Sequence, residues 1–361
     1  MNKTKVALIF GGRSAEHEVS INSAKNIAAA IDKNKYDLIT IGISKSGSWY
    51  HTTALDKTSS LTDDNLNEND FQSILFSIDK GQGHLVNTKT KEIINIDVVF
   101  PIIHGTYGED GCIQGFLKML KIPFTGCSVL SSATGMDKDV MKQIFTYSSI
   151  PNAPYLLIRP WNKISFKDLT GKLGLPFFIK PANAGSSVGV HKIKSESEFS
   201  DKLKDSFSYD TKVIAEKFIR GREIEISVLG LSSSPEVSEP GEIRSNHEFY
   251  SYDAKYLDQN GAIVTIPAQL TETVKTQIKN LAKKTFTTLN CSGFARIDFF
   301  VTEDEDVLIN EINTLPGFTN ISMYPKMWGA SGLSYTNLIS KLIELGLEQD
   351  KIDQSLKTNW L

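Results

Sequence analysis

The chain of 361 residues carries 39 Lys and Arg against 42 Asp and Glu, for a net charge of −3, and is 40% hydrophobic and 22% charged. These values are typical of a soluble globular protein of about two or three domains. No basic run or basic–aromatic stripe favours nucleic-acid binding, and no apolar run approaches the length of a membrane span. The three scattered cysteines, Cys112, Cys127 and Cys291, lack metal spacing and favour a reducing cytoplasm.

The N-terminal part of the chain alternates between apolar runs and a helical pattern. The run Val6–Phe10 predicts a buried strand, and a helix and a second strand, Leu38–Ile43, follow it. This order favours a parallel sheet, to which Val98–Ile103 adds a strand. Glu16 and His104 lie in glycine-rich loops after two of these strands, where open α/β sheets bind ligands. Glu16 could hold a substrate ammonium or only complement a helix dipole. His104 is a substrate-site candidate, although a lone histidine is more often structural.

The remaining elements follow from the same periodicities. Helices are predicted over Met136–Ser149 and over 272–289, and a final helix is expected to stop at Gly346. Residues 57–70 and 231–262 are predicted to be polar loops. The following segments predict further strands: Leu75–Ile78, His84–Val86, Phe177–Lys180, Val190–Ile193, Val213–Phe218 and Glu225–Leu229.

A loop rich in glycine and serine, Ala182–Gly189, is a candidate phosphate site. The chain has neither a P-loop nor a dinucleotide fingerprint, but successive backbone N–H groups in such a loop can cradle phosphate oxygens. Lys180 at the preceding strand end, and Lys138 near a helix start, could supply cations. The alternative is a flexible hairpin loop, because Gly and Ser are common in turns.

The segment from Glu216 to Glu223 is a candidate adenosine site. A strand that runs into a glycine turn forms a natural hinge, whose backbone can read an adenine edge. Glu223 is the candidate for the ribose hydroxyls and Glu216 for the adenine side. The alternative is surface charge around a turn, which is the interpretation kept for Lys217, Arg220 and Arg222.

Two apolar runs, Ile297–Val301 and Val307–Ile309, flank an acidic turn and predict a β-hairpin. If the strands pair, the side chains of Asp298, Glu311 and Asn313 can converge, because residues two apart share one face of a strand. Such an all-oxygen set suits Mg²⁺ that arrives with a nucleotide. Arg296 adds a cation, and the Gly317 amide can approach a ligand closely. The alternative is a hairpin whose charges face water.

An aromatic loop at 245–262 is a candidate lid. It is too long for a simple turn, and long loops in compact domains often cover sites. Lys255 and Tyr256 could close over a substrate, whereas Tyr250 and Tyr252 could pack on the surface.

At these residues the chain resembles the D-alanine–D-alanine ligases of the ATP-grasp superfamily. The motifs GGRSAEHEVS, HGTYGEDGCIQG, FFIKPANAGSSVGV, EKFIRGREIEISVLG, FYSYDAKY, GFARIDFF and NEINTLPGFTNISMYP occur in order along nearly the whole chain. The resemblance implies a three-domain α+β and α/β fold with a parallel-sheet domain over 1–125. It further implies a central ATP-grasp domain over 126–215 and a C-terminal one over 216–361, with ATP between their sheets.

The resemblance also implies roles for individual residues. Those implied to contact nucleotide are Lys138, Lys180, Ser187, Glu216, Ile219 and Glu223. Those implied to hold Mg²⁺ or Mn²⁺, as two ions, are Asp298, Glu311 and Asn313. Those implied to serve the two D-alanines and the acyl centre are Glu16, Ser186, Tyr256, Arg296, Gly317, Ser322, His104, Lys255 and Met323. Within this last set, Glu16, Ser186 and Tyr256 are implied to form a hydrogen-bonded triad.

The implied reaction is ATP-dependent joining of two D-alanines through D-alanyl phosphate, for peptidoglycan synthesis in the bacterial cytoplasm. Acyl activation requires positioning and charge neutralisation more than a protein nucleophile, which agrees with the residues found. The alternative within the family is a ligase that makes D-alanyl-D-lactate or D-alanyl-D-serine. A nucleotide-binding module without catalysis is a further alternative. Such a module should lack one of the four polar residues of the hairpin, but all four are present: Arg296, Asp298, Glu311 and Asn313. The resemblance implies a homodimer, and the composition predicts no nucleic-acid or membrane partner. The base that deprotonates the second substrate stays open between Tyr256 and a phosphate oxygen.

Overall fold

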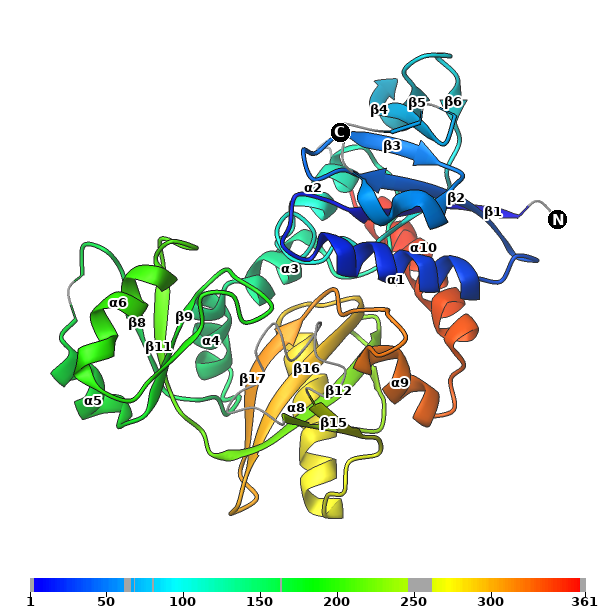
Figure 1. Ribbon diagram of the computed structural model, residues 1–361. Helices are drawn as coiled ribbons and strands as arrows, with labels where there is room; N and C mark the ends of the chain where they lie inside the picture. Colours follow the sequence, from blue (N-terminus) through cyan, green and yellow to red (C-terminus); the bar gives the residue numbers. More distant parts are fainter. Residues whose placement is uncertain are drawn as a thin grey trace.

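The computed structural model describes residues 3–61, 66–67, 69–79, 81–162, 164–245 and 262–357. Within these residues three β-sheets of seven, four and six strands form the framework, and helices cover them (Figure 1). No helix in these ranges combines the length and the apolar composition that a membrane span needs.

The seven-stranded sheet has the order β6-β5-β4-β3-β2-β1-β7. Strands β2, β1 and β7 pair in parallel, as the strand–helix–strand pattern predicts, and β3 to β6 extend the sheet by antiparallel pairing. The predicted strands Leu75–Ile78 and His84–Val86 are confirmed within β4 and β5, which pair with each other. The strands are β1 (Thr4–Gly11), β2 (Tyr36–Ile43), β3 (Trp49–Thr52), β4 (Phe71–Asp79), β5 (Gln82–Asn87), β6 (Ile93–Ile94) and β7 (Val98–Pro101), with the 3₁₀ helix η1 (Leu55–Ser60) after β3.

Helices from both ends of the chain cover this sheet. On one face, Ile27 of α1 (His17–Ala30) and Leu342 of α10 (Tyr335–Ser355) share a core with Phe100 of β7. On the other face lies α2 (Cys112–Met119), which buries Ile113 and Leu117. The C-terminal helix therefore packs against the N-terminal sheet, where Figure 1 shows it beside α1.

The predicted stop of the last helix at Gly346 is wrong. Helix α10 continues to Ser355, and Gly346 is buried inside it. A Cβ atom at Gly346 would lie 2.8 Å from the carbonyl oxygen of Phe124. The glycine therefore lets the helix approach another backbone closely and does not end the helix.

The predicted helix over Met136–Ser149 is two helices, α3 (Val129–Met136) and α4 (Lys138–Tyr147). Asp137 separates them, because its backbone is extended (φ −83°, ψ 101°) and its carboxylate caps the first turn of α4. This break places Lys138 at the first position of α4.

The four-stranded sheet has the order β10-β9-β11-β8 with antiparallel pairing throughout. Helices α5 (Phe166–Leu173) and α6 (Glu196–Ser206) flank it, and Leu169, Phe177 and Val213 lie in its apolar core. The strands are β8 (Tyr155–Ile158), β9 (Phe177–Pro181), β10 (His191–Ile193) and β11 (Val213–Lys217).

The six-stranded sheet is antiparallel and has the order β15-β14-β12-β16-β17, with β13 paired to β12. Its strands are β12 (Gly221–Gly230), β13 (Glu236–Val237), β14 (Gly241–Ser245), β15 (Ala262–Thr265), β16 (Gly293–Thr302) and β17 (Val307–Asn313). The described part of segment 231–262 thus holds β13, β14 and the first residue of β15, where only a loop is predicted. The helix α8 (Glu272–Thr288) covers one face, and α9 (Met323–Ala330) follows β17.

Helix α4 lies between the four-stranded and the six-stranded sheet, and its Asp139 accepts a hydrogen bond from Tyr155 of β8. Its apolar side chains Met141 and Phe145 lie in the core of the six-stranded sheet with Ile297 and Ile309. The chain crosses from the four-stranded sheet to the six-stranded sheet between Lys217 and Gly221. The chain thus passes to the six-stranded sheet just after the predicted domain boundary at 215/216. Helix α4, which was predicted to belong to the central domain, packs against this six-stranded sheet.

Candidate active site

The polar residues of the β16–β17 hairpin lie on one face of the sheet. Antiparallel pairing sets Asp298 opposite Glu311 and Arg296 opposite Asn313, as the two-residue spacing predicts. The register shifts by one residue after Asp298, a bulge that interrupts regular pairing at this point. Among the described residues, no three His, Cys, Asp or Glu side chains are arranged to hold a metal, so the predicted ligand set depends on Asn313.

Arg296 is the electrostatic centre of this hairpin. Its guanidinium donates two hydrogen bonds of 2.8 Å to the carboxylate of Asp298, and its Nε lies 3.1 Å from Oε2 of Glu225. Burial opposes the positive charge, but these two carboxylates outweigh burial and raise the pKa of Arg296 well above its usual value. Glu225 on β12 is a functional candidate that the sequence reasoning missed; it lies two residues after Glu223, on the same strand face.

Helix α4 brings Lys138 to the same hairpin. The Nζ of Lys138 lies 3.5 Å from Oε2 of Glu311 and donates a 2.8 Å hydrogen bond to the carbonyl of Ala184. The phosphate-loop candidate 182–189 is therefore tied to α4. Within this loop, Ser186 and Ser187 have left-handed backbones with φ of 49° and 61°, which cost non-glycine residues about 1–3 kcal/mol each. Such backbone strain is typical of loops shaped for a ligand.

Lys180 and Glu216 form an ion pair of 2.5 Å between β9 and β11. A second lysine, Lys142 of α4, is fully buried and pairs with the other oxygen of Glu216. Burial lowers the pKa of Lys142, and Glu216 offsets this shift only in part. Burial alone would raise the pKa of Glu216, but the two lysines outweigh it and hold the carboxylate ionised. Burial also disfavours the charge on Lys180, yet Glu216 and Glu311 raise its pKa.

This cluster changes the expectation for Glu216. Its carboxylate pairs with two lysines, so it stabilises the cations beside the loop 182–189. Lys142 was missed in the sequence because it looks like an ordinary helix residue. The available signal was its spacing of four from Lys138, which puts both lysines on one face of α4.

Glu16 connects the loop after β1 to the loop 182–189, the candidate phosphate loop. The hydroxyl of Ser186 donates a short hydrogen bond to Oε1 of Glu16, and Glu16 is only 8% exposed. Gly105, with φ of 74°, lies so close that a Cβ there would be 2.7 Å from Oε2 of Glu16. The structure therefore brings together two of the three residues of the predicted triad. The third, Tyr256, lies with Lys255 outside the described residues.

His104 is buried and linked to the loop after β17. Its Nε2 is 2.9 Å from the hydroxyl of Ser23, and its Nδ1 is 3.2 Å from the carbonyl oxygen of Leu315. Nδ1 also lies 3.6 Å from Oε1 of Glu109. Burial and the nearby charge of Glu16 raise the pKa of the Glu109 carboxyl, although His104 opposes this shift.

The turn after β17 brings the last predicted residues together. A Cβ at Gly317 would lie 2.7 Å from the Ser322 hydroxyl, so the turn and the start of α9 are in contact. The Ser322 hydroxyl accepts a 2.9 Å hydrogen bond from the amide of Thr319. Met323 begins α9, and the first backbone N–H groups of a helix, which lack partners within the helix, form a positive end suited to a carboxylate.

The nucleotide candidates Ile219 and Glu223 lie at the passage from β11 to β12. Ile219 is in the connection itself, half-buried, and Glu223 is on β12 opposite Phe300 of β16. Glu223 and Glu225 are two apart and share the sheet face that carries Asp298.

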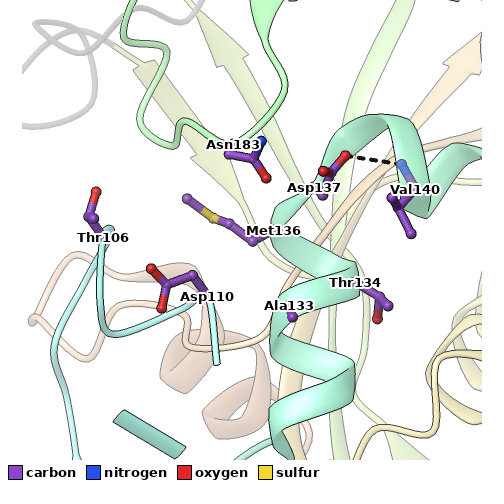
Figure 2. A pocket seen from close by; sticks show the side chains of 8 residues that line it. All are labelled: Thr106, Asp110, Ala133, Thr134, Met136, Asp137, Val140 and Asn183. Atoms are coloured by element: carbon purple, nitrogen blue, oxygen red, sulfur yellow. Dashed lines mark hydrogen bonds between the residues drawn. The ribbon is translucent and has the colours of Figure 1, made fainter. Parts of the chain in front are cut away.

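A pocket of about 520 Å³ opens beside the junction of α3 and α4 (Figure 2). On one side lie Thr106 and Asp110 of the loop after β7, which face Asn183 of the loop 182–189. Met136 and Asp137 line the pocket from the junction of α3 and α4. The pocket is therefore bordered by the loop after β7, the start of the loop 182–189 and the junction of α3 and α4.

Two family models match the chain. The model described as "D-ala D-ala ligase N-terminus" covers residues 5–127, and "D-ala D-ala ligase C-terminus" covers residues 144–344. The D-alanine--D-alanine ligase of Oceanobacillus iheyensis is 48% identical over 99% of both chains. D-alanine--D-alanine ligase A of Salmonella typhimurium is also 48% identical, over 99% of this chain and 100% of its own.

Solved structures agree with these relatives. The D-alanine-D-alanine ligase of Coxiella burnetii superposes with a TM-score of 0.87 at 38% identity, covering 98% of this chain and 97% of its own. The VanG D-Ala:D-Ser ligase of Enterococcus faecalis has a TM-score of 0.85 at 35% identity and coverage of 96% and 100%. The Bacillus anthracis D-alanine--D-Alanine ligase complexed with ATP has a TM-score of 0.74 at 28% identity and coverage of 97% and 99%.

The fold and the site together define an ATP-grasp enzyme. Within that class the chain belongs to the D-alanine–D-alanine ligase family, and it is a ligase.

Proposed function

We propose that the chain joins two D-alanine molecules to D-alanyl-D-alanine with ATP, through D-alanyl phosphate, in the synthesis of peptidoglycan precursors. The observation that carries this function is the meeting of distant segments: Glu16 with Ser186, and Lys138 with Glu311. These contacts join an ammonium-binding carboxylate, a phosphate loop and a metal-type hairpin. The curated relatives at 46% to 48% identity are D-alanine–D-alanine ligases, which supports this substrate over D-serine or D-lactate.

ATP lies between the four-stranded and six-stranded sheets. Lys138, Lys180 and the loop containing Ser187 neutralise its phosphates, because they combine buried cations with closely spaced amide donors. Glu223 accepts hydrogen bonds from the ribose hydroxyls. Ile219 covers the adenine, and Glu216 lies at the adenine side while it keeps Lys180 and Lys142 charged.

Asp298, Glu311 and Asn313 would hold Mg²⁺ or Mn²⁺, as two ions. The donor set fits, because it consists of oxygens on one sheet face and the two carboxylates are paired across the strands. Arg296 pairs with Asp298 and Lys138 lies 3.5 Å from Glu311, so protein cations also balance the charge of these carboxylates. When bound, the metal neutralises charge on the phosphoryl group that is transferred.

The first D-alanine is held by Glu16 through its ammonium, with His104 beside it. Its carboxylate is a poor electrophile until ATP phosphorylates it with release of ADP. The amine of the second D-alanine, after its ammonium has lost a proton, then attacks the acyl carbon, and inorganic phosphate leaves as the C–O bond breaks. The tetrahedral intermediate carries an oxyanion, which Arg296 and the Gly317 amide stabilise. Ser322 and the Met323 amide bind the carboxylate of the second D-alanine at the N-terminus of α9.

The functional unit is a homodimer in the bacterial cytoplasm, where ATP is available. Light scattering on the purified chain tests the dimer directly. A mass of one chain at working concentrations would refute it.

The deciding experiment measures phosphate release with D-alanine as the only amino acid and identifies the product by mass. The expected product is D-alanyl-D-alanine, also when D-serine and D-lactate compete. Arg296→Ala should lower the turnover by at least about 10²-fold, the size of a lost oxyanion donor. No dipeptide from the wild-type chain, or normal turnover of the variant, would contradict the proposal.

A further inference from the structure

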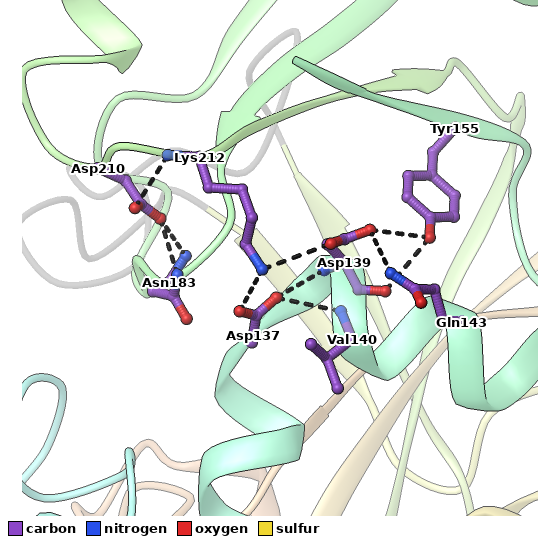
Figure 3. Close-up of polar contacts among 8 residues, drawn as sticks. All are labelled: Asp137, Asp139, Val140, Gln143, Tyr155, Asn183, Asp210 and Lys212. Carbon is purple, nitrogen blue, oxygen red and sulfur yellow. Dashed lines mark hydrogen bonds and ion pairs between the residues drawn. The ribbon is translucent and has the colours of Figure 1, made fainter. Parts of the chain in front are cut away.

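A buried lysine outside the predicted site lies behind the phosphate loop (Figure 3). Lys212 directly precedes β11, and its Nζ forms a short ion pair with Asp137 and lies 3.4 Å from Oδ2 of Asp139. Lys212 is 8% exposed and Asp139 is 4% exposed. A buried charge is costly unless it is paired, so this lysine holds its two partners firmly.

The two aspartates flank Lys138, the first residue of α4. Asp137 accepts hydrogen bonds of 3.1 Å from two backbone N–H groups of the first turn. Asp139 accepts hydrogen bonds from the amide of Gln143 at 3.0 Å and from the hydroxyl of Tyr155 at 3.1 Å. The first turn of α4, and with it the backbone of Lys138, is fixed on both sides.

Lys212 also holds the start of the loop 182–189 through its backbone. Its carbonyl oxygen accepts a 2.8 Å hydrogen bond from the amide of Ala182. The carbonyl of Ala182 in turn accepts a 2.9 Å hydrogen bond from the amide of Lys138. Lys212 therefore touches both phosphate-binding segments, one through its side chain and the other through its backbone.

Asp210 links Lys212 to Asn183 of the loop 182–189. Its carboxylate accepts hydrogen bonds from the backbone and side-chain amides of Asn183, at 2.8 Å and 3.0 Å, and from the amide of Lys212 at 3.1 Å. Asp137 and Asn183 both line the pocket, so the network reaches its wall (Figures 2 and 3).

We propose that Lys212 is a positioning residue, which fixes Lys138 and the loop 182–189 relative to each other and so sets the geometry of phosphate binding. This inference rests on the proposed function, because it requires that these two segments bind ATP phosphates. A lysine that only stabilised the fold would affect all ligands alike. A positioning lysine affects the phosphate part of the nucleotide and leaves the adenosine part unchanged.

The test compares Lys212→Met with the wild-type full-length chain by calorimetric binding of two probes. The probes are the non-hydrolysable ATP analogue AMP-PNP with Mg²⁺, and adenosine. We expect the affinity for AMP-PNP to fall at least about tenfold, which corresponds to the loss of one charge-assisted contact, while the affinity for adenosine stays within about twofold. Lys204→Met, at an exposed position of α6, is the matched control and should change neither affinity.

A second variant keeps the test decisive if Lys212→Met does not fold. Asp137→Asn retains an oxygen that can cap α4 but removes the charge that pairs with Lys212. It should lower the affinity for AMP-PNP more than that for adenosine. Equal losses for both probes, or no loss, would overturn the positioning role. If the wild-type chain binds AMP-PNP no more tightly than adenosine, the proposed function itself fails.

Discussion

Glu216 offers a sharp test of how this site holds its charges. Its side chain is 5% exposed, and it lies between Lys142, which is fully buried, and Lys180, which is 11% exposed. Glu216→Gln keeps the volume of the side chain but leaves both ammonium groups without their shared partner. Removing one member of a buried ion pair typically costs about 3–5 kcal/mol. This is a large part of the about 5–15 kcal/mol that stabilises a domain.

The variant should also show a different dependence on pH. Burial already lowers the pKa of Lys142, and Glu216 is the first group that opposes this shift, so the pKa falls further in the variant. The folded variant then binds fewer protons at Lys142 than the unfolded chain does. Its stability therefore rises as the pH increases from the neutral range towards 10.5, the ordinary lysine pKa.

Urea unfolding followed by tryptophan fluorescence, at about pH 7 and about pH 10, measures both effects. Glu303→Gln is the matched control, because Glu303 pairs with Arg220 at 3.4 Å on the surface, where both side chains are at least 80% exposed. It should cost no more than about 1 kcal/mol. Adding Lys142→Met to Glu216→Gln should restore part of the lost stability. A loss in Glu216→Gln no larger than in the control would refute the reasoning.

Three further outcomes are expected. Glu311→Gln should lower D-alanine-dependent ADP release at least about 10²-fold, because it removes a charged metal donor; a normal rate in a coupled assay would contradict this. Gly105→Ala should raise the KM for D-alanine about tenfold, because a left-handed backbone is strained and the new Cβ displaces the Glu16 carboxylate. An unchanged KM would exclude that displacement. Gly346→Ala should lower the unfolding free energy by about 1–2 kcal/mol, because the contact with the Phe124 carbonyl outweighs the gain in helix propensity. A thermal scan that shows a higher Tm would count against this.

Local patterns predicted the parts of the site that are close in the chain. The hairpin of β16 and β17 sets Asp298 opposite Glu311 because a short turn and the two-residue period of a strand determine the register. The loop from Ala182 to Gly189 was recognisable because it combines small residues with a lysine at the strand end.

Contacts between distant segments were not predictable in the same way. Glu225 reaches Arg296 because β12 pairs with β16, and nothing in either strand specifies that partner. Gly346 resembles a helix stop in sequence, and only the backbone of Phe124 explains why a glycine is needed there.

By itself, the sequence determined the alternation of strands and helices, the family and the chemical types gathered in the site. These depend on periodicity, turn residues and motifs within short stretches, where local geometry leaves few alternatives. The tertiary structure alone decided which charges neutralise one another, as with Lys212 between Asp137 and Asp139, or Lys142 beside Glu216. The physical reason is that a buried charge is stable only beside its partner, and here each partner comes from an element that folding, not sequence distance, brings near.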